Sequence, residues 1–421
     1  MIDPNILRTD LHRLGRSLRR RGLDVDLVDL ARLDEQVRRT RQQSEEIRAL
    51  QKEAGREIAS LAGPEKSAAI GRVSQLADDY KRLDADAEEL AERFNQAWAT
   101  IPNLVDDSAA DGLTDADNQE LKRVGAPPVF DFAPSDFTTI GSKLDLVDMD
   151  RGAKVSGSRF GYLKGQAVLL EFALVRYAFD HLVAQGFTPM VPPVLVRENA
   201  LYGTGFFPAD REQVYAVPDD DLFLVGTSEV PLAAYHADEI LESLPARYAG
   251  FSTCFRREAG SYGRDTQGLF RVHQFDKVEM FVFTRVEDSR HEHDRLLAIE
   301  EDIVSGLGLP YRVVNVAAGD LGASAAKKFD IEAWFPSQQT YREITSCSNT
   351  TDYQARRLKV RYRSEGGNQL VHTLNGTAVA VGRMILAILE NYQEAEGSVA
   401  MPKALVPYLG FERIKSSSVL A

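Results

Sequence analysis

The chain has 421 residues, of which 44% are hydrophobic and 27% charged, a composition typical of a globular protein with two or three domains. The formal net charge of −13 argues against a general affinity for nucleic acids, so a nucleic-acid site would have to be a local basic face. Two cysteines, Cys254 and Cys347, cannot build a disulfide framework or a four-cysteine zinc site, and we expect no structural metal.

The amino-terminal segment MIDPNILRTDLHRL contains no signal-peptide core. Further along the chain, no window approaches the roughly 18 consecutive apolar residues of a membrane-spanning helix. We therefore expect a cytoplasmic protein without a membrane segment.

Two runs of apolar residues at alternating spacings of three and four follow, from Leu30 to Leu61 and from Ile70 to Ile101. Between them, the stretch AGPEKS at residues 62–67 has a glycine and a proline, which end one helix and begin the next. The pattern predicts two antiparallel helices in a hairpin. At about 1.5 Å per residue, each helix would be about 45 to 50 Å long.

Two functions fit such an arm. It could join subunits, as coiled coils often do. It could also bind RNA, because arginines occur before it and along its first helix, although interleaved glutamates would suit an ordinary solvated face as well. The sequence leaves both functions open. The arginines are Arg13, Arg16, Arg19, Arg20, Arg21, Arg38, Arg39, Arg41 and Arg48.

After Ile101 the periodicity gives way to DDSAADGLTDADNQE and GAPPVFDFAPSDF, which are rich in Asp, Gly and Pro. We interpret this region as a linker. A mixed body follows, with a helix near residues 166–185 and alternating strands and helices to the end. These patterns divide the chain into an arm domain at residues 1–104 and a body at residues 105–421.

The stretch FSTCFRREAGSYGRDTQGLFRVHQFDKVEMFVF, at residues 251–283, is unusually charged for a strand pair. Two runs with a period of two flank a glycine-containing loop, which predicts an antiparallel hairpin. In the second run, the odd positions are Arg271, His273, Phe275, Lys277 and Glu279. If the polar faces of both strands coincide, one patch would carry Arg256, Glu258, Arg271, Phe275 and Glu279.

These five side chains would suit a nucleotide. Arginines bind phosphate oxygens in a bidentate manner, an aromatic ring stacks on a base for about 1 to 3 kcal/mol, and a glutamate accepts from an exocyclic amine. A surface hairpin with cross-strand salt bridges would explain any single Arg–Glu pair, but five such groups on one face favour a site. No G-x-x-x-x-G-K-[ST] motif occurs, and no G-x-G-x-x-G follows a strand, so a nucleotide site would depend on side chains.

Two short segments add oxygen ligands. VGTSEV, at residues 225–230, places Thr227, Ser228 and Glu229 after an apolar run, which suits an ammonium group, although a helix cap would look similar. YREITSCSN, at residues 341–349, places Glu343 and Ser346 as donors of the kind that Mg²⁺ accepts beside phosphates. A hydroxyl-rich strand end is the alternative there.

Within the segment LNGTAVAVGRMILAILE, at residues 374–390, we expect a helix rich in small residues that packs on a sheet. It carries Arg383 near its start. A buried arginine needs an anionic partner, so this residue is a further candidate for phosphate binding.

In this order, TSEV, FRREAGSYGRDTQGLFRVHQFDKVEMF, REITSCSNTTDYQARR and LNGTAVAVGRMILAILENYQ resemble the signature of bacterial-type seryl-tRNA synthetases, which are class II aminoacyl-tRNA synthetases. GFTPMVPPVLV resembles class motif 1, the charged hairpin motif 2 and LNGTAVAVGRMILAILEN motif 3. The resemblance covers nearly the whole chain, including the helical arm.

The resemblance implies an α+β fold, with an amino-terminal coiled-coil hairpin that binds tRNA and a catalytic domain at residues 105–421 whose antiparallel sheet is flanked by helices. It implies a homodimer that joins serine to tRNA-Ser, and to tRNA-Sec, through a seryl-adenylate, with ATP as substrate and with Mg²⁺.

The resemblance also implies roles for individual residues. Arg256, Arg383 and Glu343 are expected to be catalytic, and Glu343 and Ser346 to hold the metal. The expected ATP contacts are Arg256, Arg257, Glu258, Arg271, Val272, Phe275, Glu343, Ile344, Thr345, Ser346 and Arg383. The expected serine contacts are Thr227, Ser228, Glu229, Arg256, Glu279, Asn375 and Thr377.

The loop at residues 259–268 is expected to meet the acceptor end of tRNA, and Tyr262 and Gln267 in it differ from many relatives. Two other functions remain open. A ligase that loads an amino acid onto a carrier protein would keep the charged hairpin but not need the arm. An inactive RNA-binding relative would keep the arm but should have lost part of the charged set.

Overall fold

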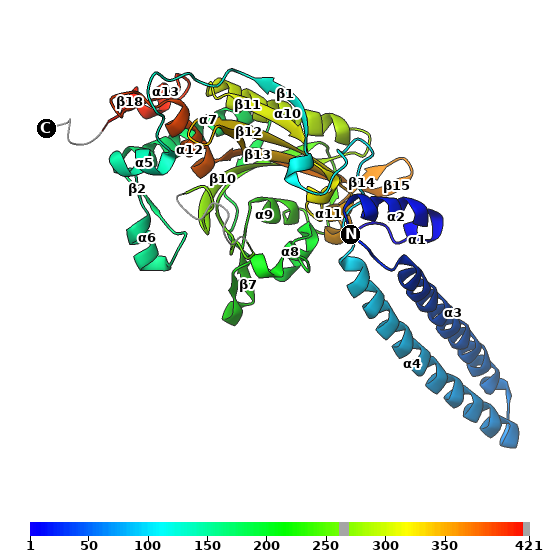
Figure 1. Cartoon of the computed structure of the whole chain (residues 1–421). Coiled ribbons are helices and arrows are strands. Elements are labelled where there is room, and N and C mark those ends of the chain that lie inside the picture. The colour runs from blue at the N-terminus through cyan, green and yellow to red at the C-terminus, as the bar shows by residue number, and fades with distance from the viewer. Residues whose placement is uncertain (261–268, 416–421) are drawn as a thin grey trace. The chain divides into compact units, whose positions relative to one another are not determined.

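The computed structural model describes residues 1–260 and 269–415. The chain divides into two compact units, one of residues 3–102 and one of residues 1–2 with 103–421 (Figure 1). None of the helices among the described residues combines the length and the apolarity needed to cross a bilayer.

The unit of residues 3–102 is helical. It contains α1 (Ile6–Thr9), α2 (Leu11–Arg20), α3 (Leu27–Glu57), a short 3₁₀ turn (Ile58–Ser60) and α4 (Gly63–Ala99). The two long helices lie side by side in Figure 1. They run antiparallel, because Ser44 donates a hydrogen bond to Asp84 (3.4 Å) and the Arg48 guanidinium lies 5.3 Å from the Tyr80 ring. The predicted helical hairpin is therefore confirmed.

The turn and seam of this hairpin differ in detail from the prediction. The helix α4 already begins at Gly63, with Pro64 in its first turn, so the turn is shorter than residues 62–67. Ile70 was expected in the seam but is 52% exposed, whereas Ala69 is buried. Near the hairpin tip, the seam is formed instead by Ala69 and Val73, which are four residues apart and lie on the more buried side of α4.

The second unit is built on an eight-stranded sheet with the order β1-β11-β12-β13-β16-β10-β9-β4. All neighbours pair antiparallel except β4 and β9, which pair parallel. The strands, in sheet order, are β1 (Gln119–Val124), β11 (Tyr311–Asn315), β12 (Lys327–Phe335), β13 (Thr340–Thr351), β16 (His372–Ala380), β10 (Gln274–Thr284), β9 (Ala246–Phe255) and β4 (Thr188–Met190). The predicted α+β fold with an antiparallel sheet is confirmed.

Helices and small sheets surround this large sheet (Figure 1). The helices are α5 (Phe137–Lys143), α6 (Met149–Ser156), α7 (Gln166–Ala184), α8 (Glu198–Thr204), α9 (Glu229–Ala234), α10 (Ser289–Gly306), α11 (Tyr353–Leu358), α12 (Val381–Asn391) and α13 (Val406–Leu409). The small sheets pair β2 (Val147–Asp148) with β3 (Tyr162–Leu163), β7 (Leu222–Leu224) with β5 (Leu195–Val196) and β6 (Ala216–Val217), β14 (Arg361–Ser364) with β8 (Ile240–Leu241) and β15 (Gly367–Leu370), and β17 (Val399–Ala400) with β18 (Arg413–Ile414).

The strand β10 separates two environments. Its even residues Val278, Met280 and Val282 are fully buried in the main core, which α7, α10 and α12 complete. Its odd residues Phe281 and Phe283 pack in a different cluster with residues of α9 and α11. Since side chains alternate along a strand, the odd positions Phe275, Lys277 and Glu279 lie on the face away from the main core.

The interpretation of DDSAADGLTDADNQE (residues 106–120) and GAPPVFDFAPSDF (residues 125–137) as a linker is wrong in part. Val105 and Ala109 are buried against Val316 and Leu321, and β1 pairs with β11 at the edge of the large sheet. The segment escaped prediction because every residue of β1 up to Arg123 is exposed, so that the strand carries no alternation of apolar residues.

Candidate active site

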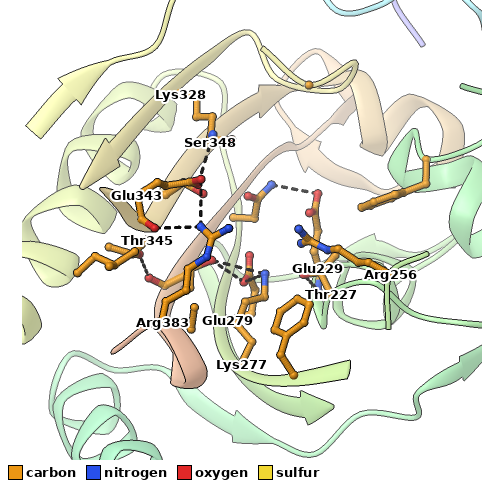
Figure 2. A pocket seen from close by; sticks show the side chains of 18 of the residues that line it. Thr227, Glu229, Arg256, Lys277, Glu279, Lys328, Glu343, Thr345, Ser348 and Arg383 are labelled. Carbon is orange, nitrogen blue, oxygen red and sulfur yellow. Dashed lines mark hydrogen bonds and ion pairs between the residues drawn. The ribbon is translucent and has the colours of Figure 1, made fainter. Parts of the chain in front are cut away.

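A cavity of about 410 Å³ opens over the non-core face of the large sheet. Its walls come from β10, β13, β16, the start of α12, and the segments that end β9 and precede β10. Figure 2 shows charged side chains entering it from opposite sides. Of the predicted site residues, it is lined by Thr227, Glu229, Arg256, Glu258, Arg271, Val272, Phe275, Glu279, Glu343, Ile344, Thr345, Ser346, Asn375, Thr377 and Arg383.

The five residues of the charged hairpin all reach this cavity, but only two of them lie on a strand. Arg256 and Glu258 follow the end of β9, and Arg271 precedes β10. Glu258 has a φ of 50°, which turns the chain out of the strand direction, and its carboxylate accepts a hydrogen bond from Arg271 at 2.6 Å. The expected common strand face is therefore replaced by an ion pair beyond the strand ends.

Arg256 is held in place from two sides. Its Nε donates to the Gly226 carbonyl at 3.2 Å, and its guanidinium carbon lies 5.2 Å from the centre of the Phe275 ring. Arg271 keeps a buried Nε that has no hydrogen-bond partner among the described residues. Guanidinium groups form strong charge-assisted hydrogen bonds with phosphate oxygens, so both arginines are candidates for binding phosphate.

The opposite wall holds a carboxylate between two cations. Glu343 on β13 accepts from Arg383 at 3.1 Å and lies 3.8 Å from the Lys328 ammonium (Figure 2). Although enclosure opposes ionisation, Lys328 and Arg383 lower the pKa of Glu343 to about 2. The residue is therefore a carboxylate throughout the physiological pH range. Ser346, on the same strand, adds a hydroxyl oxygen to this wall.

These two oxygen donors fit a magnesium ion that is bound mainly by substrate phosphates and water. Among the described residues no group of three or more acidic, histidine or cysteine side chains could hold a metal ion by itself. The donor set thus fits Mg²⁺ carried in with a nucleotide better than a permanently bound ion.

A second acidic region lies at the other end of the cavity. Glu229, at the start of α9, accepts hydrogen bonds from Gln354 at 2.7 Å and from Asn375 at 3.0 Å. Burial, together with the charge of Glu279, raises the pKa of Glu229 to about 7. Thr377 donates to Glu279 at 3.2 Å. The region would suit a small cationic ligand with a hydroxyl group.

Two predicted residues are placed outside the lining. The Ser228 hydroxyl is buried beside the Ser252 hydroxyl at 2.8 Å, and the Arg257 guanidinium lies 5.8 Å from the Tyr215 ring. Thr227 also fulfils part of the alternative helix-cap role, because its hydroxyl accepts from the Glu229 N–H at 3.1 Å. Tyr262 and Gln267 lie outside the described residues, as does most of their loop.

The cavity also contains residues that were not predicted. Lys277 on β10 and Lys328 on β12 both line it. Strand alternation places Lys277 on the same face as Phe275 and Glu279, so its position could have been predicted. It was not included because a lysine in a strand is usually interpreted as a solvent-exposed charge. Residues 204–206, at the end of α8, and the loop residues 322–325 also line the cavity, and no local pattern marks them.

Beneath the cavity floor, α10 buries an acid completely. Glu300 is 0% exposed, and neither of its carboxyl oxygens has a hydrogen-bond partner among the described residues. A Cβ added at Gly376 would come within 2.9 Å of its Oε1. Burial, followed by the charges of Glu279 and Asp330, raises the pKa of Glu300 well above its ordinary value.

Glu300→Gln is therefore expected to stabilise the protein at alkaline pH. The folded state keeps a proton that the unfolded chain releases above its ordinary pKa, so the wild type loses stability as pH rises, and the neutral glutamine does not. The gain should be clear at pH 8 and should shrink at pH 5.5. Urea unfolding at both pH values measures it, with the exposed Glu287→Gln as control. An equal loss of stability at both pH values would contradict this account.

Comparisons with known proteins agree with these features. The family model described as "Seryl-tRNA synthetase N-terminal domain" matches residues 1–105, and "tRNA synthetase class II core domain (G, H, P, S and T)" matches residues 215–392. The chain is 52% identical over 418 residues to a serine–tRNA ligase from Acidothermus cellulolyticus, covering 99% of each chain.

Two solved structures are similar over nearly the full length. The seryl-tRNA synthetase from Pyrococcus horikoshii, complexed with ATP, is 37% identical with a TM-score of 0.94, covering 99% of this chain and 100% of that one. The cytoplasmic serine–tRNA ligase from Naegleria fowleri, in complex with AMP, is 33% identical with a TM-score of 0.89, covering 99% of both chains.

Proposed function

Because the chain belongs to the seryl-tRNA synthetase family and attaches serine to tRNA-Ser with the use of ATP, we propose that the cavity described above is where serine and ATP react. The observation that carries this proposal is the meeting of three groups in one cavity of about 410 Å³: Arg256, the cation-flanked Glu343, and the acidic region around Glu279. The serine carboxylate would attack the α-phosphorus of ATP, giving seryl-adenylate and pyrophosphate.

The nucleotide would lie between the hairpin ends and α12. Phe275 and Val272 offer apolar contacts for the adenine, and Glu258 an acceptor for its amine. Arg256 would bind the α-phosphate and the serine carboxylate, whereas Arg271 and Arg383 would bind the outer phosphates. Charge-assisted hydrogen bonds aimed at the reacting phosphate are an effective form of transition-state stabilisation, and no protein nucleophile is needed.

Glu343 and Ser346 would hold Mg²⁺ together with the phosphates, and the bound ion would neutralise their negative charge. Arg383 and Lys328 balance the charge of Glu343. Arg383 would bind the phosphates of ATP, and the Glu343 carboxylate would then be available to hold the ion. Ile344 and Thr345, on the same strand, complete this wall.

The serine would lie at the acidic end of the cavity. Thr227 and Glu229 would contact its ammonium group, and Glu279 and Thr377 its hydroxyl. Asn375 fixes the Glu229 carboxyl through its hydrogen bond at 3.0 Å. Ser228 and Arg257 would act only indirectly, because neither lines the cavity.

The second step would transfer the seryl group from the adenylate to a hydroxyl of the terminal ribose of tRNA, with AMP as the leaving group. We assign residues 1–104 to binding tRNA-Ser, and tRNA-Sec, and residues 105–421 to catalysis. The arm offers α3 and α4, which have 31 and 37 residues, and exposed arginines along α3. RNA recognition by such an arm would depend on RNA shape and phosphates.

A homodimer in the cytoplasm completes the proposal. Support for the dimer comes from α7 and the segment after β4, where large apolar side chains are left open to solvent. Leu169, Phe172 and Val183 are 51%, 61% and 51% exposed and fall on one stripe of the helix, and Val191 is 82% exposed. An apolar surface of this kind is typical of protein interfaces.

The metal assignment predicts a change in the requirement for Mg²⁺. Glu343→Gln keeps the shape of the side chain but removes its charge, so the concentration of Mg²⁺ giving half-maximal serine-dependent ATP–pyrophosphate exchange should rise by about tenfold or more. The KM for serine should stay within about twofold, since the acidic end is untouched. The exposed Glu287→Gln serves as the control. An unchanged Mg²⁺ dependence would remove Glu343 from the metal site.

A further inference from the structure

A lysine is buried beside the acid that is proposed to receive the serine hydroxyl. Lys277 and Glu279 are two residues apart on β10, so their side chains leave the strand on the same face. Their side chains are only 8% and 2% exposed, and the ammonium and carboxylate form an ion pair (Figure 2). Both residues line the cavity, and the proposed binding of ATP gives their ion pair no role.

Only one of the two carboxylate oxygens of Glu279 takes part in the bonds within this group. Oε2 binds the Lys277 ammonium and accepts the Thr377 hydroxyl at 3.2 Å. The Lys277 ammonium also donates to the Thr377 oxygen at 3.5 Å. Thr377 is held opposite Glu279 by the register between β10 and β16. Oε1 has no hydrogen-bond partner among the described residues.

Lys277 provides the positive charge that balances Glu279 in an acidic region of the cavity. Acids approach Glu279 from two further elements: Glu229 from α9 and Glu300 from α10. Arg256 lies after β9 at the same cavity but is engaged with Gly226 and Phe275. Among the described residues, Lys277 is the only cation that forms an ion pair with Glu279.

We propose that Lys277 is the positioning residue that sets specificity for serine, because it fixes Glu279 through Oε2 and leaves Oε1 to accept the substrate hydroxyl. This inference rests on the proposed assignment of Glu279 to the serine pocket. The Thr377 hydroxyl gives its proton to Glu279, so it cannot donate to the substrate hydroxyl, whose own single proton is left for Oε1. Alanine would leave Oε1 buried and unpaired, and such a site rejects an analogue that lacks the hydroxyl.

The test compares Lys277→Met with Lys277→Arg in the full chain. Serine- and alanine-dependent ATP–pyrophosphate exchange gives kcat and KM for each amino acid and for ATP. Without the charge, KM for serine should rise by about 30-fold or more and the preference for serine over alanine should fall by at least about tenfold, while KM for ATP stays within about threefold. The arginine variant should recover most of the preference.

Lys122→Met is the matched control, because Lys122 forms an ion pair with Glu301 on the same unit but is 53% exposed. It should leave all constants unchanged. Thermal melting checks folding, and if Lys277→Met is unfolded, Lys277→Gln carries the same expectation. An unchanged preference for serine over alanine, or an equal rise in KM for serine and ATP, overturns the inference. A wild type that shows no serine-dependent exchange would instead refute the proposed site.

Discussion

Arg256→Ala is expected to lower serine-dependent ATP–pyrophosphate exchange by about 10³-fold while the protein stays folded. Removal of one preorganised donor to a developing charge costs about 10² to 10³ in kcat, and a charged, bidentate donor stands at the upper end. Arg256 is preorganised in this sense, because the Gly226 carbonyl and the Phe275 ring hold its guanidinium at the cavity wall. Much of the loss should appear in kcat, since the interaction strengthens as charge builds on the phosphate.

Arg290→Ala provides the comparison. Arg290 lies on α10 with its side chain 84% exposed, and its loss should leave exchange unchanged. Circular dichroism and thermal melting of both variants show whether the fold is kept. Exchange by Arg256→Ala within a few-fold of wild type would mean that the phosphate is bound elsewhere, and the proposed arrangement of substrates would then be wrong.

Shortening the arm should separate the two steps of the reaction. Residues 40 and 88 face each other, as judged from the contact between Ser44 and Asp84, so residues 41–87 can be replaced by a short flexible link. The base of the hairpin keeps its packing around Val37, Ala91 and Phe94. Serine-dependent exchange should stay within about threefold, whereas kcat/KM for charging tRNA-Ser should fall by about 10³-fold, because many phosphate contacts are lost together.

A milder variant tests whether charge on the arm is responsible. Arg39 and Arg41 are exposed on α3 and have no ion-pair partner among the described residues. Changing both to glutamine should raise the KM for tRNA and flatten its dependence on salt, with exchange unaffected. If charging by the shortened chain remained near wild type, the arm would serve another purpose, such as joining subunits.

The elements with a strong period were predictable. The alternation of charged and apolar residues predicted the β9–β10 hairpin, and the spacing of three and four predicted α3 and α4. Other parts depend on contacts between distant segments. Nothing within QELKRV marks β1 as a strand, since only pairing with β11 makes it one. Ile70 fitted a heptad pattern but is exposed, because Ala69 occupies the seam.

The site residues also fall into two groups: those that a local pattern predicts and those that depend on contacts between distant segments. Phe275 and Glu279 were predicted because a charged face on a strand is rare, and Arg256 was predicted with them although it lies just beyond the end of β9. Lys328 was missed, since its relation to Glu343 depends on the pairing of β12 with β13, which no local pattern reveals. The ion pair of Arg271 with Glu258 forms past the ends of both strands, where alternation has no predictive value.

The central claim is that this cavity activates serine. Its most direct test is ATP–pyrophosphate exchange by the unmodified chain with each of the twenty amino acids, in the presence of Mg²⁺ and without tRNA. The account predicts strong exchange with serine, and little with alanine or threonine, because Glu279 needs a hydroxyl partner in a small pocket. Strong exchange with a different amino acid would contradict the assignment of Glu279, and no exchange with any amino acid would contradict the claim itself.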